Sequence, residues 1–493
     1  MAEAVIEERQ LLKSLHWYDG FVIALCNPGF LIGSLGFSLA TVGALGSVIL
    51  WGTSALVGLL QNWVYSESAT MFPDKPGGIA LYAHEGWRKY FNLIGPIAAF
   101  GYWIGWSVVL SIFGNLIGSL IAAQWFPENT TIYFSTGPVD VGLGQLIGVA
   151  VIAGVWLFNV FGVKPSLMVG YITGALLMVP LAVFIIVPYL TGDWQSSNIV
   201  YTEVEGFSKV SVGLMWLFIM CWSAYGIEVC ASFAPEYHDT KRDTSLALRT
   251  SAVFSLMVYV LLPLGLGGVV GSAGDAGPFY VNAFQTIAGE GFGSIALVLL
   301  IASLILSMNT ATADGGRALY GIAQDGMTIK WLHHLNRFHV PGRAMTVDMI
   351  VNVLLILFIA NNLAILYLSN IGYVLAHVFA LTAFLLLRRD RPQWPRPIRL
   401  GPAWTPVVML LAVFNLVLVI WGVTQQELAA AIGGYTFSGI PFLVGVGVLV
   451  LSVLLFFYRR VVEDGARITF RDTNVPTMPN AKQMELLREE ARG

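Results

Sequence analysis

Trp222-Ser223-Ala224-Tyr225-Gly226-Ile227-Glu228 lies in the middle of an apolar run that extends from about residue 210 to residue 233. A carboxylate near the middle of a lipid bilayer is costly, so Glu228 at this depth indicates a functional site. Gly226 stands two residues before it, at a point where a helix can open. The stretch therefore predicts a membrane helix that is interrupted at Gly226 and carries a functional carboxylate.

A second interruption is expected in the apolar run 16–40, at Asn27-Pro28-Gly29-Phe30. Pro28 has no amide hydrogen to donate, and it disfavours the helical conformation at the residue before it. Two interrupted membrane helices, one early in each half of a long apolar chain, are typical of transporters with a substrate site between two repeats.

The composition is that of a polytopic membrane protein. Hydrophobic residues make up 56% of the 493 residues and charged residues 11%, and the mean hydropathy is +0.73. A soluble protein carries roughly 25% charged residues. Cys26, Cys221 and Cys230 all lie in apolar runs, which favours buried free thiols over disulfides or a metal or redox site. No cofactor, metal or catalytic group is expected, and the polar N-terminus argues against a cleavable signal peptide.

Twelve apolar stretches reach the length of about 20 residues that is needed to cross the hydrocarbon. They lie near 16–40, 44–69, 93–124, 142–162, 166–190, 210–233, 249–272, 292–312, 345–361, 363–388, 404–424 and 437–458. The pattern predicts an all-α protein with twelve transmembrane helices. Its only soluble parts are an N-terminal segment, 1–15, and a tail, 459–493.

The basic residues indicate how these spans are oriented. If the N-terminus is cytoplasmic, the cytoplasmic segments hold all but one of the 26 Lys and Arg residues, the exception being Lys209. A missed or added span would destroy this partition. The positive-inside rule therefore favours twelve spans in the cytoplasmic membrane with both termini in the cytoplasm. No basic stripe outside the membrane flanks points to nucleic acid.

Motifs in the predicted cytoplasmic loops follow a fixed order. They are Met71-Phe72-Pro73-Asp74-Lys75-Pro76-Gly77-Gly78 after the second helix, Pro235-Glu236-Tyr237-His238-Asp239-Thr240-Lys241-Arg242 after the sixth, Asp314-Gly315-Gly316-Arg317-Ala318-Leu319-Tyr320 after the eighth, and Leu387-Arg388-Arg389 at the end of the tenth. Together with Trp222-Ser223 and Gly226-Ile227-Glu228, they resemble the amino acid–polyamine–organocation (APC) superfamily of permeases. The resemblance extends from about residue 15 to residue 406.

The resemblance implies a LeuT-like fold of two inverted five-helix repeats, here 16–190 and 208–390, followed by two further helices in 404–458. It also implies a secondary active transporter that moves a small amino acid or amine by alternating access. The unwound centres of helices one and six would hold the substrate, because free amides favour a carboxylate and free carbonyls favour an ammonium group. The residues expected there are Asn27, Pro28, Gly29, Phe30, Trp222, Ser223, Ala224, Tyr225 and Gly226.

The chain departs from the family at helix one. Family members usually carry a glycine-rich triplet whose amides bind the substrate carboxylate, whereas this chain has Asn27-Pro28-Gly29-Phe30. The alternative function is therefore a sodium-coupled symporter or exchanger of an organic amine or cation that lacks a carboxylate. A channel or sensor built on the same fold is another interpretation. An intramembrane enzyme would need a second polar group near Glu228, for which the sequence offers His377.

The sequence leaves both H⁺ and Na⁺ as candidates for the coupling ion. Glu228 is a candidate for proton coupling or gating, the alternative being a structural hydrogen bond. Some proton-coupled relatives carry a lysine in helix five, where this chain has Leu177. Ser307 and Thr310 in helix eight are candidates for an ion site, although small polar residues also mediate plain helix packing. The expected partners are the substrate, one of these ions and the lipid bilayer.

Overall fold

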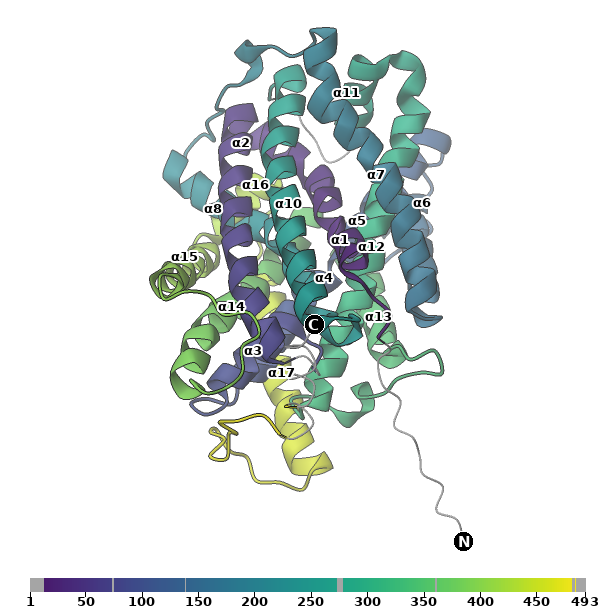
Figure 1. Cartoon of the computed structure of the whole chain (residues 1–493). Helices are drawn as coiled ribbons and strands as arrows, with labels where there is room; N and C mark the ends of the chain where they lie inside the picture. Colours follow the sequence, from purple (N-terminus) through teal and green to yellow (C-terminus); the bar gives the residue numbers. More distant parts are fainter. Residues whose placement is uncertain are drawn as a thin grey trace.

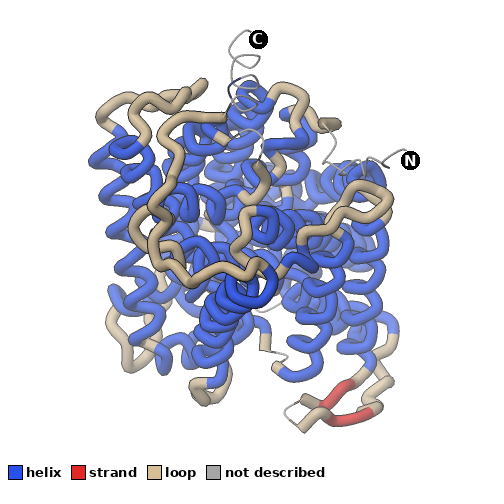
Figure 2. Tube along the Cα trace, turned by 90° about the horizontal axis from the view of Figure 1, so that it is seen from below, coloured by secondary structure: helices blue, strands red, loops and turns tan. Residues whose placement is uncertain are grey.

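The computed structural model describes residues 13–72, 75–137, 139–272, 278–359, 361–480 and Met484. In these residues the chain is a bundle of helices, most of which run nearly parallel or antiparallel to one another (Figure 1). One small hairpin pairs Phe134–Ser135 (β1) with Asp140–Val141 (β2) in antiparallel register, at the periphery of the bundle (Figure 2). The all-α prediction is confirmed.

The α-helices have the following bounds in chain order: α1 Trp17–Ala24, α2 Cys26–Met71, α3 Gly78–Trp87, α4 Ile94–Ser107, α5 Val109–Trp125, α6 Leu143–Val160, α7 Val163–Thr191, α8 Lys209–Ala224, α9 Val229–Ser232, α10 Thr240–Val270, α11 Pro278–Ala288, α12 Gly293–Gln324, α13 Gly342–Phe358, α14 Asn362–Asp390, α15 Trp404–Thr424, α16 Gln426–Gly433 and α17 Ile440–Tyr458. Short 3₁₀ turns include η2 Gly226–Glu228 and η3 Ala234–Glu236.

Ten helical segments among the described residues are long and apolar enough to cross a membrane. Each of the twelve predicted ranges is mainly helical, but two features lower the number of separate long helices. The ranges 16–40 and 44–69 share α2, and α13 has only 17 residues. The chain is thus a multi-pass membrane protein, and the count of twelve spans stays a prediction.

α2 is a hairpin of two helical arms joined at Gly43, whose φ of 71° lies in the left-handed region. A side chain there would collide with the carbonyl oxygen of Val200. The turn is also held by two backbone bonds of 3.1 Å, from Leu45 N–H to Val200 O and from Thr202 N–H to Val42 O. Glycine is required here because both the conformation and the close approach exclude a Cβ.

The helices that carry the predicted site lie in the centre of the bundle. α2 packs along α10 and also contacts α8, η2 and α12, while α14 packs along α4 and α12 along α7 (Figure 1). Most polar residues of α2 and α12 are accordingly buried in protein instead of facing lipid. Such burial is the condition for keeping polar groups in a membrane helix.

The prediction that a loop begins at Asp314, after helix eight, is wrong. The segment from Asp314 to Tyr320 belongs to α12, which continues to Gln324. Asp314 is fully buried, and Arg317 pairs with Glu236 of η3 through Nε–Oε1 and Nη2–Oε2 bonds of 2.5 and 3.0 Å. The predicted span ended before Asp314 and Arg317 because only apolar residues were counted as membrane helix. A helix can nevertheless carry charged residues where these are paired inside the protein.

The other loop motifs meet at the same end of the bundle. Glu85 of α3 forms ion pairs with Lys75, Arg88 and Arg391, with nitrogen–oxygen distances of 3.1, 3.2 and 2.7 Å, respectively. Burial by itself raises the pKa of Glu85, but these three cations outweigh it and hold the pKa well below its usual range. Lys75 also pairs with Asp325 at the end of α12. Pro73 and Asp74 of the first motif lie outside the described residues.

Only parts of the two predicted soluble segments are described. In the N-terminal segment 1–15, residues 13–15 are described, and Ser14 N–H and Leu15 N–H both donate to Glu236 O at 2.9 Å. In the tail, Asp472 N–H donates to Arg88 O at 2.8 Å, so this part packs beside α3. The helical patch expected at 484–487 lies outside the described residues except for Met484.

Candidate substrate site

Helix six is interrupted where the sequence predicts it. α8 ends at Ala224, Tyr225 follows, and η2 covers Gly226–Glu228 before helical structure resumes in α9. The tighter 3₁₀ turn breaks the regular α-helical pattern of backbone hydrogen bonds at membrane depth. Non-α backbone at this depth is tolerated only inside protein or beside a cavity, and every residue of η2 is buried.

Helix one is interrupted earlier than predicted, and it is not unwound at the predicted residues. α1 ends at Ala24, Leu25 forms a turn, and α2 begins at Cys26, so Asn27, Pro28, Gly29 and Phe30 are helical. Proline is tolerated in the first turn of a helix because the amide hydrogen that it lacks has no helical partner there. The proline thus follows the break, and the prediction of an unwound stretch at 27–30 is wrong.

The two interruptions face each other through Gly226 and Asn27. A Cβ built on Gly226 would collide with Asn27 Oδ1 and would lie 3.2 Å from Cζ2 of Trp106. The Asn27 amide donates from Nδ2 to Ala24 O at 3.0 Å, while its fully buried Oδ1 has no hydrogen-bond partner among the described residues. The close approach of these two side chains to the backbone explains why glycine occupies position 226.

Tyr259 of α10 joins the two interrupted helices, and no pattern in the sequence pointed to this role. Its hydroxyl lies 2.9 Å from the carbonyl oxygens of Asn27 and Ser223 and 2.6 Å from Ser223 Oγ. Since a hydroxyl has one hydrogen to donate, it can satisfy only one of the two carbonyls at a time. Ser223 is therefore placed at the junction of the helices.

Aromatic side chains fill the space beside the interruptions. Phe30 stacks on Trp222 with ring centroids 4.8 Å apart and an interplanar angle of 12°, and Phe113 meets both rings edge-on. Trp106 lies 5.5 Å from Phe30. Phe30 and Trp222 are at most 3% exposed, so these rings are shielded from solvent.

Glu228 is buried at the end of η2, and only one of its two carboxyl oxygens has hydrogen-bond partners in the described part of the chain. Its Oε1 accepts hydrogen bonds from Trp106 Nε1 at 3.0 Å and from Tyr373 OH of α14 at 2.6 Å. Its Oε2 has no partner among the described residues. The carboxyl therefore has both a structural role and one free oxygen that can carry a proton.

Two further buried carboxyl groups were missed by the sequence analysis. Asp314 of α12 accepts a hydrogen bond from Ser232 Oγ, and Asp348 of α13 accepts one from Trp103 Nε1 at 3.0 Å. Both are fully buried, and each has one oxygen without a partner in the described part of the chain. Asp348 was detectable by the criterion applied to Glu228, because it lies inside an apolar run.

His377 lies close to the site but does not contact Glu228 through any of the hydrogen bonds described. Its Nδ1 is 2.8 Å from Tyr65 OH, and its ring meets Tyr225 edge-on with centroids 5.1 Å apart. The hydroxyl of Tyr225 has no hydrogen-bond partner among the described side chains. Tyr225 thus brings an unsatisfied polar group to the helix-six interruption.

The two candidate ion-site residues contact helix one at its break. Ser307 Oγ donates to Cys26 O at 3.0 Å, and Thr310 Oγ1 donates to Ile23 O at 3.2 Å. A Cβ on Gly29 would lie 2.5 Å from Ser307 Oγ, so the two helices touch closely here. Thr310 also borders a cavity of about 20 Å³, which is large enough for one water-sized ligand.

Together these features define an all-helical, multi-pass membrane protein in which buried polar and aromatic side chains gather where α2 meets η2. The sequence profile of the family described as "Amino acid permease" matches residues 15–458. The chain therefore belongs to the amino acid permease family, within the APC superfamily. Members of this family are transporters and not enzymes, and membership implies a LeuT-like fold.

Two curated relatives illustrate the range of this similarity. The D-serine/D-alanine/glycine transporter of Escherichia coli (strain K12) is 23% identical over 379 residues, covering 72% of this chain and 79% of the relative. The arginine/agmatine antiporter of Chlamydia pneumoniae is 22% identical over 458 residues, covering 87% of this chain and 89% of the relative.

Proposed function

We propose that the protein is a secondary active transporter that moves a small amino acid or amine by alternating access. The observation that carries this proposal is the contact between Gly226, in the helix-six interruption, and Asn27, in the first turn after the helix-one break at Leu25. The substrate is held between the residue groups 27–30 and 222–226, after Phe30 and Trp222 separate. Unpartnered buried polar atoms at Asn27, Trp222 and Tyr225 support this placement, because such atoms need a ligand or water.

The choice between an amino acid and an amine depends on whether the site binds a substrate carboxylate. Both relatives are named for amino acids, the antiporter also for the amine agmatine. The missing glycine triplet in helix one favours a substrate without a carboxylate. An amino acid is the first choice because the family as a whole supports it. A sodium-coupled symporter or exchanger of an organic cation is the second, supported by the contacts of Ser307 and Thr310 with helix-one carbonyls.

We further infer twelve spans in the cytoplasmic membrane, with both termini in the cytoplasm. The repeats are 16–190 and 208–390, and 404–458 adds two helices. The partition of basic residues supports this orientation. The packing of described parts of both terminal segments against the inner-loop motifs is consistent with it, because both then lie at one end of the bundle.

Counterflow in proteoliposomes tests the proposal. We expect vesicles preloaded with the right amino acid or amine to accumulate the labelled compound transiently, because a carrier exchanges substrate without net driving force. Candidate substrates are selected beforehand by thermal stabilisation of the purified protein, using amino acids and their carboxyl-blocked analogues. Replacing external Na⁺ with choline tests the sodium-coupled alternative, because uptake by a sodium-coupled symporter would then be lost. Conductance without saturable counterflow would contradict a carrier.

Glu228→Gln is expected to flatten the pH dependence of uptake. The glutamine carbonyl still accepts from Trp106 and Tyr373, so the hydrogen bonds to Oε1 are retained while the titratable proton is removed. Uptake is measured from mildly acidic to mildly alkaline pH in proteoliposomes. Glu427→Gln, which neutralises an exposed carboxylate on α16, is the matched control. An unchanged pH profile in Glu228→Gln would show that Glu228 has only a structural role.

A further inference from the structure

A basic pocket lies outside the substrate site, where the chain leaves α14 and enters α15. It is lined in part by Arg388, Arg396, Arg399 and Thr405, and its volume is about 530 Å³. Pro392 and Pro402 border the same space, so the segment between the helices forms a stiff rim. Three guanidinium groups around one opening are a strong local concentration of positive charge.

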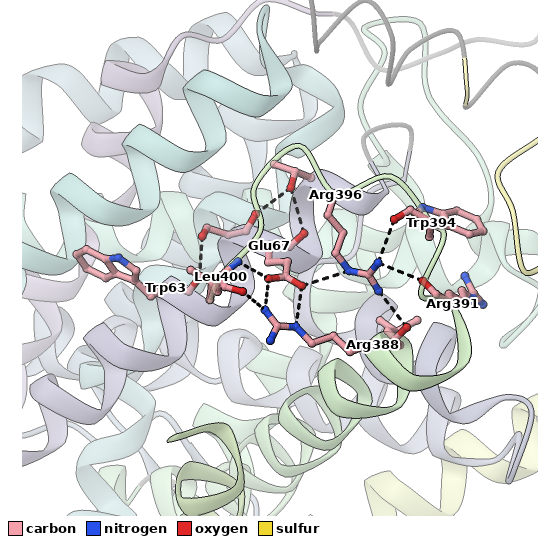
Figure 3. A network of polar contacts seen from close by, with 10 residues as sticks. Trp63, Glu67, Arg388, Arg391, Trp394, Arg396 and Leu400 are labelled. Carbon is pink, nitrogen blue, oxygen red and sulfur yellow. Dashed lines mark hydrogen bonds and ion pairs between the residues drawn. The ribbon is translucent and has the colours of Figure 1, made fainter. Parts of the chain in front are cut away.

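One buried carboxylate fixes two of these arginines. Figure 3 shows Glu67 of α2 between Arg388 and Arg396. Arg388 donates from Nε and Nη2 to the two oxygens of Glu67 at 3.0 and 2.6 Å, and Arg396 Nε lies 3.2 Å from Oε1. Leu400 N–H adds a bond of 2.8 Å to Oε2. The wall is therefore preorganised, so binding an anion does not require ordering these side chains.

The pocket keeps an excess of positive charge. Glu67 offsets one of the three cations, and the remaining contacts of Arg396 go to the carbonyl oxygens of Leu387, Arg391 and Trp394. Burial lowers the pKa of Arg396, and Arg388 and Arg399 lower it further although Glu67 opposes them. Arg399 itself is exposed, and no hydrogen bond or ion pair engages it in the described part of the chain.

The pocket lies between the ends of two candidate membrane spans, which is the level expected for lipid headgroups. α14 ends at Asp390 and α15 begins at Trp404, and both helices are long and apolar enough to span the membrane. On α15, Met409, Leu410 and Val413 are more than half exposed, which places this helix against lipid. An acyl chain on α15 and a headgroup in the pocket can therefore belong to one molecule.

We propose that this pocket binds a phosphate-bearing anion of the kind carried by anionic phospholipids, with Arg399 as its free ligand. Arginine suits this role because its planar guanidinium binds phosphate oxygens in pairs. Basic pockets between membrane helices are known to take anionic headgroups. The proposal does not depend on the identity of the transported substrate.

The test uses the full-length protein in detergent, titrated with phosphatidylglycerol, with phosphatidylcholine or with inorganic phosphate, while thermal unfolding is followed. We expect phosphatidylglycerol to stabilise the wild type and Arg399→Gln to weaken its apparent affinity by about fivefold, one headgroup contact being removed. Arg399→Glu should weaken it more. Arg467→Gln is the matched control, because it removes the same charge from an exposed tail position.

The possible outcomes answer two questions: whether the site exists, and whether its phosphate comes from a lipid or from a soluble anion. Stabilisation by phosphatidylglycerol that depends on Arg399 supports a lipid headgroup. Stabilisation by inorganic phosphate with the same dependence supports a soluble phosphate in the same pocket. Equal stabilisation by phosphatidylcholine, or equal responses in wild type, Arg399→Gln and Arg399→Glu, would overturn the proposal.

Discussion

Gly226→Leu is expected to reduce uptake to background while leaving a folded protein in the membrane. The new side chain would occupy the position where Asn27 Oδ1 and Trp106 now meet the backbone of η2. Overpacking of this kind costs about 1–3 kcal/mol, which is less than the roughly 5–15 kcal/mol by which native proteins are stable. Transport suffers more than stability, because the substrate requires the same space. Uptake in proteoliposomes and size-exclusion profiles of the variant provide the two measurements.

The matched control for this substitution is Gly447→Leu on α17. A Cβ at Gly447 meets no atom within 4 Å, so leucine there adds the same volume without filling a site. We expect Gly447→Leu to transport like the wild type. Gly226→Ala should lie between the two, since Asn27 can rotate away from a single methyl group. Wild-type uptake by Gly226→Leu would exclude the proposed position of the substrate.

Arg317→Met is expected to lower the free energy of unfolding by about 3–5 kcal/mol, because it leaves Glu236 buried without its partner. The two side chains are 2% and 1% exposed, and Arg317 also donates to Ala313 O at 2.8 Å and lies over the ring of Phe233. The ion pair joins η3, after helix six, to α12. Denaturation of the purified protein in detergent, followed by tryptophan fluorescence, measures the loss.

A double variant distinguishes loss of the pair from loss of packing. Adding Glu236→Met to Arg317→Met removes the unpaired carboxylate, and replacing a buried pair by apolar residues is often neutral. We therefore expect the double variant to recover most of the lost stability. If it is no more stable than Arg317→Met, the loss comes from the contacts of Arg317 with Phe233 and Ala313 instead.

The fold was largely predictable because apolar length and loop charge are one-dimensional signals. Runs of about 20 apolar residues located the helices, while the orientation that their flanking basic residues indicate stays a prediction. Helix bounds were less predictable where charge is buried. Asp314 and Arg317 belong to α12 because partners in other helices satisfy them, and those partners are distant in the sequence.

The candidate site was predictable only in part, for a similar reason. Gly226 marked the helix-six interruption because glycine and a nearby carboxylate are local signals. Pro28 misplaced the helix-one break, since proline in a first turn and proline in a break look alike in sequence. Tyr259 joins the two helices through one hydroxyl, which no pattern along the chain reveals.

The hairpin of α2 has a mechanical consequence. One arm carries Phe30 against Trp222, the other ends near Glu67, and only Gly43 separates them. Because two backbone hydrogen bonds fix its corner to residues 200–202, we expect the hairpin to tilt about that corner. A tilt that separates Phe30 from Trp222 would then also move Glu67 relative to Arg388 and Arg396, which bind it.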